Sequence, residues 1–228
     1  MKLRGRLAAK HLSGSGIEIG GLHAPLRVPS GATVRYVDRA TTAELRRLYP
    51  DLGLLRIVDV DVVDDGENLV TFEPSSLDFI IANHVIEHCE NPLRTLERWL
   101  SLLRPGGVIY MAVPDQRKTF DRQRPLTSFE HVLRDYSEGP AGSRRDHLRE
   151  YARLVDHVPE ADVEGVVDRW LAEDTRPHYH AWTPRTFREM LERARELESM
   201  TFSVEALSEA PDEFIAILRL TGPAGTAG

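Results

Sequence analysis

The sequence predicts an α/β fold with a doubly wound, mostly parallel seven-stranded sheet, an antiparallel C-terminal strand pair and a helical insertion. Strand patterns alternate with amphipathic helical patterns through the first half of the chain, which is typical of an open sheet with right-handed crossovers. Residues 77–82 form an almost continuous apolar run, as expected for a strand buried on both faces. A chain of 228 residues, 41% of them hydrophobic, can bury one substantial core.

The chain begins with a helical pattern. Leucines recur at near-helical spacing over residues 2–12, which predicts a short amphipathic helix lying over the sheet or the cofactor mouth. An apolar strand follows at residues 17–19. Pro25 and Pro29 then leave little room for a helix, because proline inside a helix removes a donor and clashes with the preceding turn. The connection over residues 20–31 is therefore expected to be irregular.

Residues 41–49 predict the next helix. Thr41 and Glu44 stand at the spacing of a capping box, and Leu45 and Leu48 are expected to face the core. Later helices are predicted to begin at Asn91-Pro92 and at Thr183-Pro184, since proline suits the first helical position. The first of them carries an apolar face through Leu103 and ends at Pro105-Gly106-Gly107.

Strands are expected wherever β-branched and aromatic residues cluster between turn signals. Besides residues 17–19, the predicted strands are residues 33–38, 57–62, 77–82, 108–113, 201–207 and 213–220. The last two are expected to pair antiparallel at the sheet edge. Residues 1–115 and 183–220 would then form the core, residues 116–182 a helical insertion or lid, and residues 221–228 a disordered tail.

Composition limits the partners. The formal net charge of −7 argues against a nucleic-acid partner. No run of eighteen apolar residues suggests a membrane span, and the basic N-terminus lacks the apolar stretch of a secretory signal. The single cysteine, Cys89, excludes an internal disulfide and fits a reducing compartment. We expect a cytoplasmic protein; a homodimer formed through the insertion stays open.

Polar residues follow several of the predicted strands. In open α/β sheets, ligands bind outside the carboxyl ends of the strands. These ends carry Glu18, Gly20 and Gly21, then Asp38 and Arg39, then Asp61, Asp64 and Asp65, and then Asn83 and His84. A carboxylate such as Asp38 can accept hydrogen bonds from both hydroxyls of a ribose. The alternative is that Asp38 caps the helix that begins near Thr41.

The combination of these segments resembles the class I methyltransferases that use S-adenosylmethionine. The resemblance is carried by four stretches, Gly-Ile-Glu-Ile-Gly at 16–20, Tyr-Val-Asp at 36–38, Leu-Asp-Phe-Ile-Ile-Ala-Asn-His-Val-Ile-Glu-His at 77–88 and Leu-Leu-Arg-Pro-Gly-Gly-Val-Ile-Tyr-Met-Ala-Val-Pro at 102–114. It is strong over residues 16–114, loose over the C-terminal helix and strands, and does not cover residues 116–182.

This resemblance implies roles for the residues at the strand ends. Gly20 and Gly21 would let the backbone approach the methionine moiety, and Glu18 would orient that loop or the methionine ammonium. Asp38 would bind the ribose hydroxyls. Arg39 and one of Asp61, Asp64 and Asp65 would contact the adenine. Asn83 and His84 would line the methionine side of the pocket.

One residue departs from the family pattern. The family has acid-x-Gly-x-Gly, whereas this chain has Leu22 where the second glycine is expected. Leucine resists the positive φ that glycine adopts freely. Either the loop is remodelled and still binds the cofactor, or the fold is kept in a binding or accessory protein that has lost methyl transfer.

Histidines are the candidate bases. Methyl transfer from a sulfonium needs alignment, and a base when the acceptor is a hydroxyl. Histidine serves this role near neutral pH, and the candidates are His84, His88, His178 and His180. The alternative for His88 is a hydrogen bond at a helix end. The expected acceptor is a hydroxyl of a sugar or specialised metabolite. If residues 178–182 are extended, His178 and His180 point the same way. They would then bind a metal, with Asp115 or a substrate oxygen completing the shell, in an enzyme of another reaction type. Trp182 would stack on a sugar or an aromatic acceptor.

Overall fold

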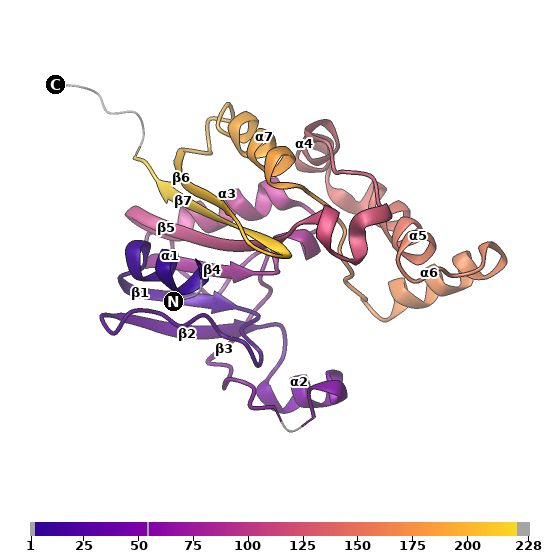
Figure 1. The fold of residues 1–228 in the computed structure, drawn as a ribbon, viewed down its shortest axis with the longest axis horizontal. Coiled ribbons are helices and arrows are strands. Elements are labelled where there is room, and N and C mark those ends of the chain that lie inside the picture. Colours follow the sequence, from indigo (N-terminus) through magenta and orange to yellow (C-terminus); the bar gives the residue numbers. More distant parts are fainter. Residues whose placement is uncertain (1–2, 54, 223–228) are drawn as a thin grey trace.

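The computed structural model describes residues 3–53 and 55–222 and has one seven-stranded sheet, in the order β3-β2-β1-β4-β5-β7-β6 (Figure 1). Its strands are β1 Gly14–Ile19, β2 Ala32–Asp38, β3 Val62–Val63, β4 Leu77–Asn83, β5 Leu103–Pro114, β6 Phe202–Glu209 and β7 Glu213–Leu220. Strand β7 runs antiparallel to both of its neighbours, while β1 to β5 pair in parallel. The predicted fold class is confirmed.

Seven α-helices are present among the described residues. They are α1 Leu3–His11, α2 Thr42–Leu48, α3 Pro92–Leu102, α4 Phe129–Glu138, α5 Arg144–Leu154, α6 Val163–Ala172 and α7 Pro184–Ala194. Short 3-10 turns include η2 Ile86–His88, η3 Gln116–Lys118 and η4 Phe120–Gln123. The predicted caps are confirmed, because the side chains of Thr41, Asn91 and Thr183 each accept a backbone N–H of the first turn.

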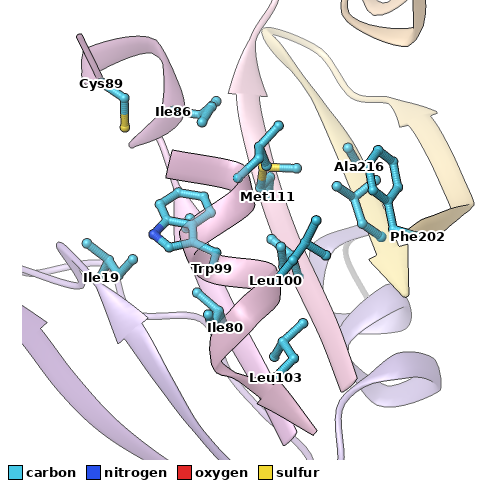
Figure 2. Close-up of a cluster of buried hydrophobic side chains, with 14 of the residues drawn as sticks. Ile19, Ile80, Ile86, Cys89, Trp99, Leu100, Leu103, Met111, Phe202 and Ala216 are labelled. Carbon is cyan, nitrogen blue, oxygen red and sulfur yellow. The ribbon is translucent and has the colours of Figure 1, made fainter. Parts of the chain in front are cut away.

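The sheet is covered on both faces. On one face α3 and α7 pack against β1, β4, β5 and β7, and Figure 2 shows Trp99 and Leu100 of α3 beside Ile80 and Met111 of the strands. Trp99 is fully buried, and its indole N–H donates to the Gly66 carbonyl (2.8 Å). The other face is covered by α1 and by the irregular segment after β1. That segment contains no helix, as its prolines predict.

Three local predictions were wrong. Strand β3 is only two residues long, because Val58 N–H donates to the Leu22 carbonyl and Val60 N–H to the Thr42 hydroxyl instead of to β2. Leu48 is 53% exposed, since the short helix α2 buries only Leu45. Leu103 does not belong to α3 but begins β5, where it pairs with Leu77 of β4.

The segment between β5 and α7 contains α4, α5 and α6. Figure 1 shows α5 and α6 beyond the carboxyl ends of the parallel strands. Helices α5 and α6 share a small apolar cluster with Tyr179. The division of the chain into a core and an insertion stays a prediction, and residues 223–228 of the predicted tail lie outside the described residues. Among the described helices, none is both long and apolar enough to cross a bilayer.

Candidate functional site

A cavity of about 240 Å³ opens at the carboxyl ends of β1, β2 and β4. It is lined by Ile19, Gly20, Leu22, Asp38, Arg39, Tyr49, Asp65, Gly66, Glu67, His84, Val85, His88, Cys89 and Arg176. Six residues that the sequence analysis singled out therefore meet in one place, namely Gly20, Leu22, Asp38, Arg39, Asp65 and His84. This is the edge of the sheet at which a doubly wound fold binds its ligand.

The loop after β1 keeps a left-handed backbone. Gly20 has φ +65° and Leu22 has φ +41°. A Cβ at Gly20 would meet only Val85, at 4.0 Å, so this position leaves the cavity open. At Gly21 there is little space for a side chain, because a Cβ there would lie 3.1 Å from the Tyr36 ring. Leu22 thus adopts the conformation expected of the missing glycine, and its side chain becomes part of the cavity wall.

Leu22 gives a direct test of this backbone. We expect Leu22→Ala to be less stable than Leu22→Gly by about 1 kcal/mol, because alanine keeps the steric cost of a left-handed residue and glycine does not. Both variants lose the same contacts of the leucine side chain beyond Cβ, so their difference isolates the backbone. Urea unfolding of the pair measures it, and an alanine variant as stable as the glycine variant would refute the φ assigned to residue 22.

Glu18 lies beneath the loop and does not line the cavity. Its carboxylate is 1% exposed and accepts the Leu26 N–H on both oxygens, at 2.9 and 3.1 Å. Asn83 Nδ2 donates to the same group at 3.4 Å. Burial raises the pKa of Glu18 to about 7, although the Leu26 N–H, Asn83 and the charge of Arg4 oppose the shift. These contacts fit a carboxyl that orients the loop over residues 20–26.

Stability is expected to depend on the protonation of Glu18. Its pKa is raised from 4.5 in the unfolded chain to about 7 in the folded protein, so the folded state binds the extra proton between these values. Stability is then greatest below pH 4.5 with respect to this group and falls by about 3 kcal/mol as pH rises to 7. Glu18→Gln should flatten this slope in denaturant titrations at pH 5 and pH 7. The exposed Glu198→Gln is the control, and an unchanged slope in Glu18→Gln would contradict the buried ionisation.

The acidic residues divide into those inside and outside the cavity. Asp38 lines it, is half-buried, and accepts the Arg39 N–H at 2.8 Å; burial raises its pKa, partly offset by Arg39. Helix α2 is capped by Thr41, so the alternative role of Asp38 as its cap is wrong. Asp61 accepts the Tyr36 N–H, and Asp64 accepts the N–H groups of residues 65 and 71. Neither lines the cavity, whereas Asp65 does.

His84 faces the cavity from the loop after β4, with φ +55° and a side chain 41% exposed. Its Nε2 lies 2.9 Å from Glu213 Oε2, and Glu213 also pairs with Arg4 of α1. Burial lowers the pKa of His84, but the hydrogen bond to Glu213 and the charges of Glu87 and Glu213 raise it overall. Because the carboxylate only accepts, Nε2 carries the proton and the lone pair of neutral His84 is at Nδ1.

A second group of side chains consists of His88, which lines the cavity, and of Glu87 and His178, which lie behind its wall. His88 Nδ1 is 2.9 Å from the Arg176 carbonyl, and His178 Nδ1 is 2.7 Å from Asp121 Oδ2. Both rings therefore carry their proton on Nδ1 and turn Nε2 elsewhere. Glu87 is 1% exposed, and neither of its oxygens has a hydrogen-bond partner in the described part of the chain. Its Oε1 is 3.9 Å from His178 Nε2 and 3.6 Å from His84 Nδ1.

The expected pairing of His178 and His180 was wrong. His178 lies with Glu87 and His88, whereas His180 is fully buried in a different cluster with His131 and His147. The segment is not free to point both rings one way, because the N–H groups of residues 179 and 180 both donate to the Glu87 carbonyl. His180 therefore does not line the cavity, and the two histidines do not share a metal.

Two further side chains of that hypothesis are also placed elsewhere. Trp182 is 1% exposed and lies between His180 and Phe187, so it is a core residue and not a platform for an acceptor. Asp115 is fully buried and paired with Arg117 and Lys118. Neither is available to the ligand of the cavity.

Several lining residues were missed by sequence reasoning. Tyr49, Glu67 and Val85 reach the cavity through the folding of loops, and no local pattern marks them. Arg176 comes from the segment before α7 and lies 3.6 Å from Asp65. His88 donates through Nδ1 to the Arg176 carbonyl, and its ring also lines the cavity.

Comparison with known proteins adds a family and a fold. A family described as a methyltransferase domain matches residues 6–194. Ubiquinone biosynthesis O-methyltransferases from three strains of Xanthomonas campestris pv. campestris are 32% identical to this chain over 95 residues. The match covers 41% of this chain and 38% of those enzymes, so it spans less than half of these curated relatives.

Solved structures share the fold at low sequence identity. The CurJ carbon methyltransferase has a TM-score of 0.50 and 15% identity, over 93% of this chain and 50% of that chain. A protein from the conversion of a disulfide bond into a thioacetal group during echinomycin biosynthesis has a TM-score of 0.51 and 14% identity, over 95% and 78%. At such identities these likenesses concern the fold alone.

Proposed function

Because this chain belongs to the family of methyltransferase domains, we propose that it transfers the methyl group of S-adenosylmethionine to a hydroxyl group of a small molecule. S-adenosylmethionine is the cofactor that the family membership implies, and its sulfonium supplies an electrophilic methyl group. The acceptor proposed is a sugar or specialised metabolite. The matched ubiquinone biosynthesis enzymes are O-methyltransferases, which agrees with a hydroxyl acceptor.

The residues of the cavity fit the cofactor. Asp38 presents a half-buried carboxylate of which one oxygen takes the Arg39 N–H, and a ribose diol suits its remaining capacity. Gly20 leaves room for the backbone to approach a ligand. Asp65 also lines the cavity, and its carboxylate would accept the adenine amino group. Glu18 and Asn83 would act from beneath, by holding the loop rather than by contact.

The observation that carries a hydroxyl acceptor is the pairing of His84 with Glu213. We assign His84 as the base: Glu213 holds Nε2–H and leaves Nδ1 to accept the hydroxyl proton as the oxygen attacks the methyl carbon. A bound cofactor would supply the methyl group and would be released as the neutral thioether. The resulting imidazolium is stabilised by two carboxylates, Glu213 at 2.9 Å and Glu87 at 3.6 Å.

The conformation of Leu22 favours this function over an accessory protein without methyl transfer. That alternative rests on a leucine that would distort the loop, whereas Leu22 keeps the left-handed backbone at φ +41°. His178 and His180, which motivated a metal-dependent reaction of another type, lie in separate clusters. His178 is held by Asp121 behind the wall and would orient Glu87 and His88 rather than touch the acceptor.

The test is transfer of an isotope-labelled methyl group. The full chain is incubated with methyl-labelled S-adenosylmethionine and a panel of phenols and sugars, with amines of matched size alongside. We expect label in one or more hydroxyl compounds and none after addition of excess demethylated cofactor. Label found only in amines would contradict a hydroxyl acceptor, and no transfer to any compound by a protein that binds the cofactor would favour the accessory role.

A further inference from the structure

Three histidines from three separate segments meet outside the cofactor cavity. His131 comes from α4, His147 from α5, and His180 from the segment between α6 and α7. Nε2 of His131 lies 2.9 Å from Nε2 of His147, and the ring centroids of His147 and His180 are 5.0 Å apart. One nitrogen from each ring falls within 4.8 Å of the other two. Such a convergence brings together the side chains that most often bind zinc.

His180 is the unexplained member of this cluster. It is fully buried, and neither ring nitrogen has a hydrogen-bond partner within residues 3–53 and 55–222. A buried polar atom without a partner is costly, and native structures usually give it one. Stacking on Trp182, with ring centroids 5.2 Å apart, fixes the imidazole plane. Stacking therefore fixes the position of the His180 ring, while both of its nitrogens lack a hydrogen-bond partner among the described residues.

A buried carboxylate lies beside one member of the cluster. Asp135 is 2% exposed; its Oδ1 accepts the Ser143 hydroxyl at 2.8 Å, while Oδ2 has no hydrogen-bond partner among the described residues. Oδ2 lies 3.2 Å from Nε2 of His131. His180 and Asp135 Oδ2 are thus buried polar groups without a hydrogen-bond partner among the described residues. The hydrogen bond between His131 and His147 involves neither of them.

The cluster is open to solvent and chemically ready for a cation. A cavity of about 410 Å³ is lined by His131, Asp135 and His147, which gives an ion a path inward. The neighbouring guanidinium of Arg124 is paired with Asp121 and Glu150.

We propose that His131, His147 and His180 bind one divalent transition metal ion, with zinc the leading candidate. Water from the adjoining cavity would take the fourth position. Zinc prefers four nitrogen and oxygen ligands in a tetrahedron, whose ligand atoms stand roughly 3.3 Å apart. The 2.9 Å between the two Nε2 atoms needs only a small widening to match this. The Nε2 proton of His131 leaves to solvent or moves to Nδ1, which the exposed Arg134 releases.

The ion would act as a clip and not as a catalyst. It would join α4 and α5 to the segment that carries Arg176 to the cofactor cavity and His178 to its wall. Occupancy of the site would fix the position of the whole 176–182 segment.

The test is metal content of the untagged full chain, loaded with ZnCl₂ and desalted. We expect about one zinc per chain by elemental analysis, a melting temperature several degrees higher than after chelation, and recovery when zinc is returned. His131→Ala and His147→Ala should each lower zinc affinity by at least tenfold, and circular dichroism checks that they fold. His23→Ala is the surface control, and it should keep wild-type affinity.

The second candidate cluster provides the decisive comparison. His88→Ala alters the Glu87, His88 and His178 group and leaves the proposed ligands intact, so it should retain its zinc. Zinc lost in His88→Ala but kept in His147→Ala would overturn the assignment. So would a wild-type chain that retains no zinc after loading, or folded His131→Ala and His147→Ala variants that bind zinc as tightly as wild type.

Discussion

Replacing His84 with asparagine is expected to lower kcat for methyl transfer by about 10²- to 10⁴-fold, the usual contribution of a general base. Asparagine tolerates the left-handed backbone at φ +55° and so keeps the loop, but it cannot take the proton of the hydroxyl. The measurement is single-turnover transfer of a labelled methyl group to the acceptor found in the panel.

The result distinguishes a base from a residue that only shapes the cavity. Affinity for S-adenosylmethionine should change by less than threefold in His84→Asn, because the loss falls on the proton transfer. The kcat of Glu213→Gln should lie between that of His84→Asn and that of the wild type. Its pH–rate profile should shift, since Glu213 helps to raise the pKa of His84. A kcat for His84→Asn within threefold of the wild-type value would remove His84 from the reaction.

Asp38→Ala is expected to weaken binding of S-adenosylmethionine by about 100-fold. A carboxylate that accepts two hydroxyl groups of the ribose contributes on this scale, because hydrogen bonds to a charged group are worth about 1.5–3 kcal/mol each. Asp38→Asn should have a smaller effect, since the amide oxygen still accepts one hydroxyl. Isothermal titration calorimetry measures all three proteins.

Asp61→Asn is the matched control for this position. Asp61 directly precedes β3. Its carboxylate accepts the Tyr36 N–H of β2 and does not line the cavity. Its affinity for the cofactor should equal that of the wild type. Asp65→Asn, inside the cavity, should weaken binding by a smaller factor than Asp38→Ala. Wild-type affinity in Asp38→Ala would remove the ribose contact from the account.

The parts of the fold that follow from the sequence are those with local causes. Thr41, Asn91 and Thr183 begin their helices because each side chain caps a backbone N–H three residues ahead. The buried strand at 77–82 could be predicted because its continuous apolar run identifies it without knowledge of its neighbours. The extent of strand β3 could not be predicted, since it depends on which distant groups accept the N–H groups of Val58 and Val60.

The site divides in the same way. Gly20, Asp38 and His84 could be placed at one edge because parallel strands end together. The partners that define the chemistry of His84 could not be predicted. Glu213 contacts His84 and pairs with Arg4, and Glu213 and Arg4 are 209 residues apart in the chain. The separation of His178 from His180 likewise depends on Asp121 and on helices α4 and α5, which local alternation does not describe.

The central claim is that the cavity at the carboxyl ends of β1, β2 and β4 holds S-adenosylmethionine. Calorimetric titration of the full chain with S-adenosylmethionine, and with its demethylated product as competitor, tests it directly. The structure predicts saturable one-to-one binding of both, at a common site that Asp38→Ala weakens. No detectable binding of either compound to the folded wild-type protein would contradict it.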